Sequence, residues 1–475
     1  MNPFNDSEDE EIEELANQFK RSVDSGNFAF FDNDDYQDII IYLIDTGDFE
    51  YAKKAVFQAI QDHPQESFFR LMRAKLFALE FNFTDAMKEL DYVEQNFEIS
   101  PEFYIEKVLI ARAANQPIDG IELLNKALDM DDRLPEAHLL LAHEFLGKRN
   151  IDTAVEHAVR AIQLDNAAAE DLKIVTIDFQ DFLQTKDHIL IQFFQRLTDE
   201  LPMCASLWSG LGLSYLACSE YEQAIEAFHF QHSLDENDPV CLLNLADAYY
   251  ELGYYEEALL NFNAVSEKCD WLMVSFQKGN CYFQMKDYQS ALNNYMQVLE
   301  IDPMYVGAIT HIVKTFKVQG KYDEARAYLR MKYEENPEQL EVIQQLIELS
   351  DPEKDIDYIR ELSVAALNAQ EIPEHAYLHF FTTYCCSNNA ADLGIEVVKD
   401  FLTDSDVCTD AHYFMAALLL TKGLLREACE YLELALQAAP DAYLIDFLNI
   451  VPQSTNEPEI NQLLNTYINF DDNNE

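Results

Sequence analysis

The sequence predicts an all-α solenoid of about twelve stacked helix pairs, and three observations lead to this prediction. A small residue recurs about every 34 positions, helical apolar patterns lie on both sides of it, and the 475 residues include only 12 Gly and 14 Pro. Few chain-breaking residues favour helices, because β-rich chains need many turns. One helix pair cannot bury its own apolar face, so neighbouring pairs must stack.

The first expected element is an amphipathic helix over residues 7–23. Ser7 and Glu10 have the spacing of a capping box, and Ile12, Leu15 and Phe19 share one helical face. We expect this helix to cap the first pair, within an acidic N-terminal segment at residues 1–32. The alternative is a mobile acidic arm.

The repeat array is predicted to cover residues 33–442. Its register is set by twelve anchor positions, ten of which are Ala or Gly, spaced 33 to 36 residues apart. The anchors are Ala52, Ala86, Gly120, Ala154, Leu190, Ala224, Ala258, Ala291, Ala325, Ile359, Gly394 and Ala428. Another small residue often precedes the anchor by twelve positions, and an aromatic residue precedes it by nine. Several Pro residues follow the anchor by twelve positions, where Pro ends the second helix.

Two units depart from this pattern. Residues 171–202 carry Leu190 at the anchor, and residues 340–373 carry Ile347 and Ile359 where small residues are expected. We expect weak or irregular repeats with local repacking at both places; the alternative is a hinge. After the array, residues 443–475 are predicted to form a capping helix and an acidic tail.

The best-matching unit reads W-x-x-L-G-x-x-Y and continues into an Ala and a Phe. Its residues are Trp208, Leu211, Gly212, Tyr215, Ala224 and Phe228. On this motif and the register around it, the chain resembles the tetratricopeptide repeat (TPR) family over nearly its whole length. In style it resembles long cytoplasmic TPR arrays of bacteria in the Bacteroidetes lineage. The resemblance implies a right-handed superhelix whose first helices line a concave groove for proteins or peptides.

By the same resemblance, the second, fifth, ninth and twelfth positions of each unit face this groove. The candidate groove residues are Phe179, Phe182, Leu213, Leu243, Asp247, Tyr250, Phe276, Asn280, Phe283, Lys314 and Lys317. Aromatic anchors beside amides suit peptide capture. Two alternatives stay open, namely packing of these side chains on neighbouring repeats and self-association. A carboxylate clamp for chaperone tails is not expected, because Ser209 and Leu213 stand where that clamp has Lys.

The charge balance narrows the class of partner. With 87 acidic and 32 basic residues, the net charge is −55. The negative electrostatic field that results disfavours binding to nucleic acids and to anionic membranes, and it favours binding to basic partners. Simple solubility is the alternative explanation of the acidic surface.

The sequence contains no motif that predicts a catalytic activity or a bound cofactor. It has neither G-x-x-x-x-G-K nor G-x-G-x-x-G, and its nine Cys include no C-x-x-C pair. We therefore expect no enzyme, no cofactor and no metal. The acidic N-terminus does not read as an export signal, and the scattered Cys favour the cytoplasm. The predicted function is a scaffold that binds proteins or peptides as a monomer or weak homodimer. The alternatives are a self-associating hub and an accessory subunit of an enzyme complex.

Overall fold

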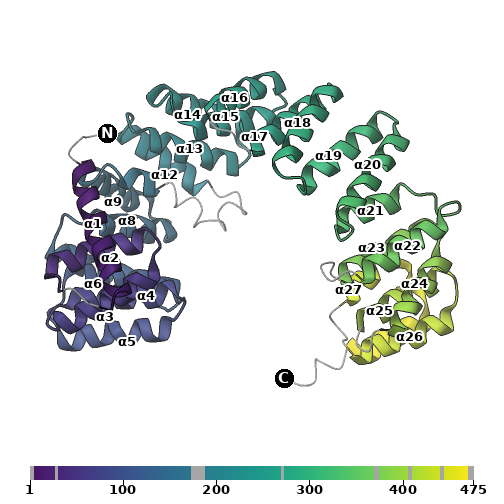
Figure 1. The fold of residues 1–475 in the computed structure, drawn as a ribbon, viewed down its shortest axis with the longest axis horizontal. Helices are drawn as coiled ribbons and strands as arrows, with labels where there is room; N and C mark the ends of the chain where they lie inside the picture. The colour runs from purple at the N-terminus through teal and green to yellow at the C-terminus, as the bar shows by residue number, and fades with distance from the viewer. Residues whose placement is uncertain are drawn as a thin grey trace. The chain divides into compact units, whose positions relative to one another are not determined.

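The computed structural model describes residues 5–26, 30–172, 188–268, 272–368, 374–404, 409–438 and 443–468. Every regular element within these ranges is a helix, as the sequence predicts for an all-α solenoid. The chain divides into two units, residues 1–269 and 270–475, and each is described by itself. In both units, successive helices pack antiparallel against their neighbours in the chain (Figure 1).

Unit 1 begins with α1, which packs against the first helix pair. Phe19 of α1 is buried and meets the rings of Phe31 and Tyr36 edge to face, while Lys20 pairs with Asp48 at 2.7 Å. The helices that the structure describes in unit 1 are α1 (Asn5–Asp24), α2 (Asn33–Asp45), α3 (Phe49–Asp62), α4 (Ser67–Leu79), α5 (Phe83–Asn96), α6 (Pro101–Ala113), α7 (Gly120–Met130), α8 (Pro135–Gly147), α9 (Ile151–Leu164), α12 (Ile189–Glu200), α13 (Ala205–Ala217), α14 (Tyr221–Leu234), α15 (Pro239–Glu251) and α16 (Tyr255–Lys268).

Unit 2 repeats the pattern and ends on three short elements. Ile460 and Leu464 of α28 share a buried cluster with Leu432 and Leu436 of α26, so α28 covers the last pair. The helices of unit 2 are α17 (Leu272–Gln284), α18 (Tyr288–Ile301), α19 (Val306–Val318), α20 (Tyr322–Glu335), α21 (Leu340–Glu348), α22 (Ile356–Asn368), α23 (Glu374–Ser387), α24 (Ala391–Asp404), α25 (Thr409–Thr421), α26 (Leu425–Ala438), α27 (Leu444–Ile450), the 3₁₀ helix η1 (Pro452–Asn456) and α28 (Pro458–Ile468).

The tight turn between the two helices of a pair recurs with one backbone signature. A residue of positive φ follows the first helix of most pairs, and members of a run lie 33 or 34 positions apart. They are Gly47, Phe81, Asn115, Arg149, Ser219, Gly253, Lys286, Gly320, Asn389 and Gly423. At Lys286, the amide donates to the Phe283 carbonyl, and the next amide reaches Tyr282, which ends the first helix. The backbone therefore carries the repeat period independently of the small residues.

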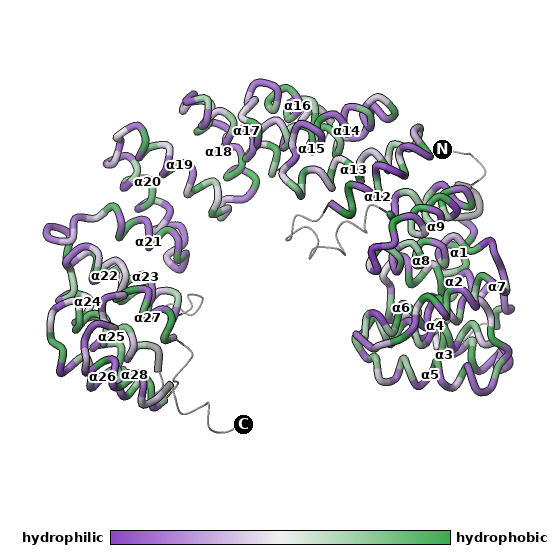
Figure 2. Tube along the Cα trace, turned by 180° about the vertical axis from the view of Figure 1, so that it is seen from behind, coloured by the Kyte–Doolittle hydropathy of each residue, from purple (hydrophilic) through white to green (hydrophobic). Residues whose placement is uncertain are grey.

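Small residues let large rings lie between the paired helices. A Cβ on Gly212 would stand 2.4 Å from the Phe228 ring, and a Cβ on Gly279 would stand 2.5 Å from the Tyr295 ring. Both rings are fully buried. Hydrophobic and hydrophilic residues alternate along the labelled helices, as expected where each helix buries one face (Figure 2). The close approach of the paired helices thus depends on a glycine at these two positions.

In the repeat at residues 340–368, different side chains fill the space between the two helices. Its first helix, α21, has only nine residues, and Pro352 lies in the connection to α22. Ile347 and Ile359 are fully buried, and so is Ser363, which stands where the regular repeats carry Phe228 and Tyr295. A large residue on the first helix is thus matched by a small one on the second.

Candidate functional site

The candidate site in unit 2 is the side of α17, α19 and α21 that carries the predicted groove positions. We call it the α17–α21 face and define it by Phe276, Asn280, Phe283, Thr310, Lys314, Lys317, Glu341, Gln344 and Glu348. These three helices are the first helices of three consecutive pairs. Side chains at equivalent positions therefore follow one another from repeat to repeat.

A cavity of about 610 Å³ lies between α19 and α21. Lys314 and Lys317 line it together with Glu341, Gln344 and Glu348. Lys317 pairs loosely with Glu348, with Nζ 3.9 Å from the carboxylate. The cavity thus presents charges of both signs beside amides, a combination that can bind the main chain and charged side chains of a peptide.

The α17 part of the face is aromatic and is joined to the cavity. The Lys314 Nζ lies 5.2 Å from the centre of the Phe283 ring, within the range of a cation–π contact. Phe283 is half-buried and also meets Tyr288 edge to face. The aromatic and charged parts are consequently continuous from α17 to α19.

Phe276 and Asn280 both contact other side chains of unit 2. The Phe276 ring contacts the rings of Tyr295, Tyr305 and His311 at centroid distances of 5.1 to 5.7 Å. Asn280 accepts a hydrogen bond from the Tyr295 hydroxyl at 2.9 Å and donates one to Gln277 at 2.7 Å. These contacts fit the packing alternative for Phe276, and its part in a groove stays a prediction.

In unit 1 the corresponding positions are apolar or acidic. Leu213, Leu243 and Tyr250 are half-buried, and Tyr250 packs edge to face on Tyr255. Burial, with a smaller contribution from Glu251, raises the pKa of Asp247 from 3.8 to about 6. The folded state therefore holds this proton more tightly than the unfolded state, and ionisation of Asp247 destabilises the fold as pH rises through this interval. Phe179 and Phe182 lie outside the described residues.

One buried cysteine and two histidines of unit 2 are engaged within the protein. Burial raises the pKa of Cys385 to about 12, so this thiol is protonated at neutral pH. His375 and His379 face Asp446 of α27, with Nε2 to carboxylate distances of 3.2 and 3.9 Å. Among the described residues, no group of three His, Cys, Asp or Glu side chains is placed to hold a metal ion. Over the same residues, no helix has the length and apolar character that crossing a bilayer requires.

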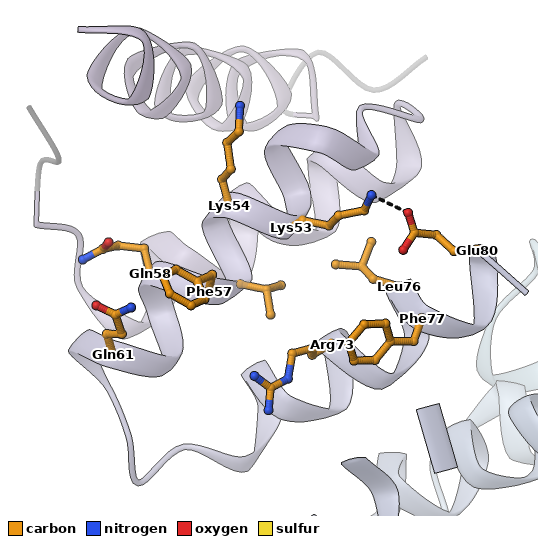
Figure 3. A pocket seen from close by; sticks show the side chains of 10 residues that line it. Lys53, Lys54, Phe57, Gln58, Gln61, Arg73, Leu76, Phe77 and Glu80 are labelled. Atoms are coloured by element: carbon orange, nitrogen blue, oxygen red, sulfur yellow. Dashed lines mark ion pairs between the residues drawn. The ribbon is translucent and has the colours of Figure 1, made fainter. Parts of the chain in front are cut away.

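Sequence reasoning missed a second cavity, between α3 and α4 (Figure 3). Its walls come from the second helix of one pair and the first helix of the next, away from the predicted groove positions. The available signal was the adjacent pair Lys53 and Lys54 in a strongly acidic chain.

Comparison with known proteins identifies the repeats. Residues 240–267 and 409–442 match one sequence profile described as "Tetratricopeptide repeat", and residues 274–305 match another of the same description. These segments are thus similar to tetratricopeptide repeats. In the described residues the chain is an all-helical solenoid, and segments of both units match TPR profiles.

Curated relatives are similar to this chain over part of their length. Anaphase-promoting complex subunit 3 of Schizosaccharomyces pombe is 23% identical over 316 residues, which cover 63% of this chain and 45% of the relative. The Hsp70-Hsp90 organising protein of Plasmodium falciparum is 33% identical over 85 residues, or 18% of this chain and 34% of the relative. The chain thus spans less than half the length of either relative.

Among solved structures, YrrB, a TPR protein with an unusual peptide-binding site, matches 47% of this chain and 96% of its own. The identity is 15% and the TM-score is 0.30.

Proposed function

We propose that this chain is a non-enzymatic scaffold that binds a protein partner through a peptide segment along the α17–α21 face. The observation that carries the proposal is the cavity between α19 and α21, because its lining comes from groove positions of two consecutive repeats. A peptide lying across them would meet Lys314 and Lys317, then the Phe283 ring. The curated relatives are by name a complex subunit and an organising protein, which favours the same class of function.

We further propose a basic partner, a cytoplasmic location and a monomeric or weakly dimeric state. A net charge of −55 speeds the encounter with positively charged proteins. The competing proposal is a self-associating hub. Sedimentation velocity across a concentration series separates the two, since a hub is already dimeric at low concentration, whereas the proposed scaffold stays monomeric or dimerises only weakly at high concentration.

The groove is tested with the double variant Phe283→Ala/Lys314→Glu and the control Lys126→Glu, an exposed charge reversal on α7. Proteins captured from the source organism's lysate are identified, and the affinity of the captured partner is then measured for each variant. We expect the double variant to lose about tenfold or more in affinity, as for a groove hot spot. The control should bind like the wild type, and circular dichroism should show the same helicity for all three proteins.

A salt series distinguishes the groove from the general acidic surface. Groove binding built on aromatic contacts should persist at high salt, whereas a partner recruited by net charge alone is lost steeply. Equal affinity of the double variant and the wild type would contradict use of the α17–α21 face.

A further inference from the structure

Two adjoining cavities lie between the last helices of unit 2, outside the α17–α21 face. The first, about 640 Å³ in volume, lies between α26 and α28, which pack side by side (Figure 2). The second, about 600 Å³, lies between η1 and the turn that joins α25 to α26. Leu425 lines both cavities, so we treat them together and call them the C-terminal groove.

The cavity between α26 and α28 combines apolar and polar surfaces. Leu425, Cys429 and Leu463 are half-buried, and the remaining residues that line it are exposed and polar. A side chain that matches such a lining has an apolar stem and a charged or polar head. Lys and Arg have this character, because they bury their methylene groups while the charged head stays near water.

The charged residues of this cavity are not balanced within the protein. Three of its nine lining residues are Glu and one is Arg. Arg426 pairs with Glu430 at 3.5 Å, but both side chains are largely exposed, so this ion pair is weak. Glu433 accepts a hydrogen bond from the neutral Tyr467 hydroxyl. Neither Glu433 nor Glu459 makes an ion pair with a described residue, so both carboxylates are left for a ligand cation.

The electrostatic field in this part of the chain is negative. Residues 427–475 include ten Asp or Glu and no Lys or Arg. Burial raises the pKa of the Cys429 thiol, and the charges of Glu459 and Glu457 raise it further. The negative charge is thus felt at an inner wall of the cavity, where it attracts a cation and repels an acidic peptide.

The adjoining cavity contains a hydroxyl without a partner. Ser454 of η1 lines it with 5% of its surface exposed, and the Ser454 Oγ has no hydrogen-bond partner among the described residues. Buried polar groups of folded proteins are nearly always paired. Because a hydroxyl can both donate and accept, a main-chain group of a bound peptide would satisfy it. This orphaned hydroxyl points to a ligand independently of the charges.

We propose that the C-terminal groove is a docking site for a partner peptide that carries a Lys or Arg side chain. The stem of that side chain lies on Leu425 and Leu463, and its charged head meets Glu433 and Glu459. The main chain beside it bonds to Ser454. This site goes beyond the proposed function, because none of its residues belongs to the α17–α21 face, and each site can fail without the other.

The test selects binders from a displayed library of random twelve-residue peptides on the full chain. Peptides that also bind the variant Glu433→Gln/Glu459→Gln are removed, which discards ligands of the α17–α21 face and of the general acidic surface. Enriched peptides should share a Lys or Arg. Fluorescence anisotropy of one such peptide should show an affinity about tenfold weaker for this double variant. Phe283→Ala/Lys314→Glu should bind it like the wild type.

A double-mutant cycle then identifies the contact. Norleucine in place of the enriched Lys or Arg removes the charge and keeps an apolar stem, so binding to the wild type should weaken about tenfold. The same replacement should have little further effect on Glu433→Gln/Glu459→Gln, because the partner charges are already gone. Alanine at this place should bind more weakly than norleucine, since it also removes the stem.

Matched variants control for net charge and for folding. Glu361→Gln/Glu427→Gln removes two exposed carboxylates of unit 2 that do not line the groove, and it should bind like the wild type. All four glutamates are exposed, so neither double variant should alter thermal unfolding. Ser454→Ala should weaken binding about threefold without lowering Tm, because the hydroxyl makes no bond that the free protein would lose.

Three outcomes of the selection would overturn the proposal. They are enrichment of peptides without Lys or Arg, the absence of any enriched sequence, and equal affinities of the wild type and Glu433→Gln/Glu459→Gln. Sedimentation velocity adds a fourth. A dimer of the wild type that is lost in the double variant would make a second copy of the chain the occupant of the groove.

Discussion

The pairs α17–α18 and α21–α22 fill the same place in the repeat in opposite ways. In the first pair, Gly279 on one helix receives the whole ring of Tyr295 from the other. In the second, Ile347 is large and the equivalent of Tyr295 is Ser363, and all three side chains are fully buried. The comparison teaches that the repeat conserves the volume between its helices rather than a small residue at a fixed position.

Removing the large residue from the irregular repeat should have the greatest effect. Ile347→Ala leaves a cavity beside a serine that cannot fill it, so we expect the free energy of unfolding to fall by about 2–5 kcal/mol. Urea unfolding followed by circular dichroism measures this change. The control, Ala246→Gly at the same position of a regular repeat, should cost about 1 kcal/mol. Equal costs for the two variants would contradict volume matching in the irregular repeat.

Adding volume to the regular repeat should have an intermediate effect. Gly279→Ala places a methyl group against the buried Tyr295 ring, and we expect a loss of about 1–3 kcal/mol, although Ala normally favours a helix. In a double-mutant cycle by thermal unfolding, the same substitution should become neutral or stabilising once Tyr295→Leu has made room. If Gly279→Ala still lowers the stability in the Tyr295→Leu background, the Tyr295 ring is not the reason that residue 279 is a glycine.

The smallest effect concerns the turns. Lys286 has a φ of +64°, a conformation that Gly adopts without steric cost and that strains a residue with a side chain. Residues 340–368 contain no positive φ. Lys286→Gly should therefore stabilise the chain by about 0.5–1 kcal/mol. Differential scanning calorimetry reads this as a rise in Tm. Glu353→Gly, in the connection of the irregular repeat, should give no such rise. A rise in Tm at both positions would mean that the positive-φ turn does not distinguish the regular repeats from the irregular one.

The sequence predicted the parts of the fold that depend on spacing within one repeat. Ala and Gly at the anchors, with aromatic residues in register, were sufficient to place the helix pairs. Contacts between repeats were harder to predict from the sequence, because they depend on how successive helix pairs are staggered. Phe276 was predicted as a groove residue with packing on a neighbouring repeat as the alternative, and only the structure shows its contacts with Tyr305 and His311 of the next repeat.

The two cavities show the same limit. Lys314 and Lys317 were predicted from their positions, but their neighbours Glu341 and Glu348 on α21 emerged only from the structure. The α3–α4 cavity was not predicted at all, since Phe57 and Leu76 lie 19 positions apart in different repeats. No pattern within one helix reveals that they face each other.

The recurring positive-φ turn also has a consequence for how such a chain can change over generations. Because the turns at Gly253, Lys286 and Gly320 are alike and lie 33 or 34 residues apart, recombination between them inserts or deletes one whole helix pair. Every helix in the product keeps its partner, and the binding surface becomes longer or shorter by one step. The connection at residues 349–355 lacks this turn, so an exchange there joins unlike ends. Recombination is thus less able to insert or delete the helix pair at residues 340–368 than the pairs that are joined by the positive-φ turn.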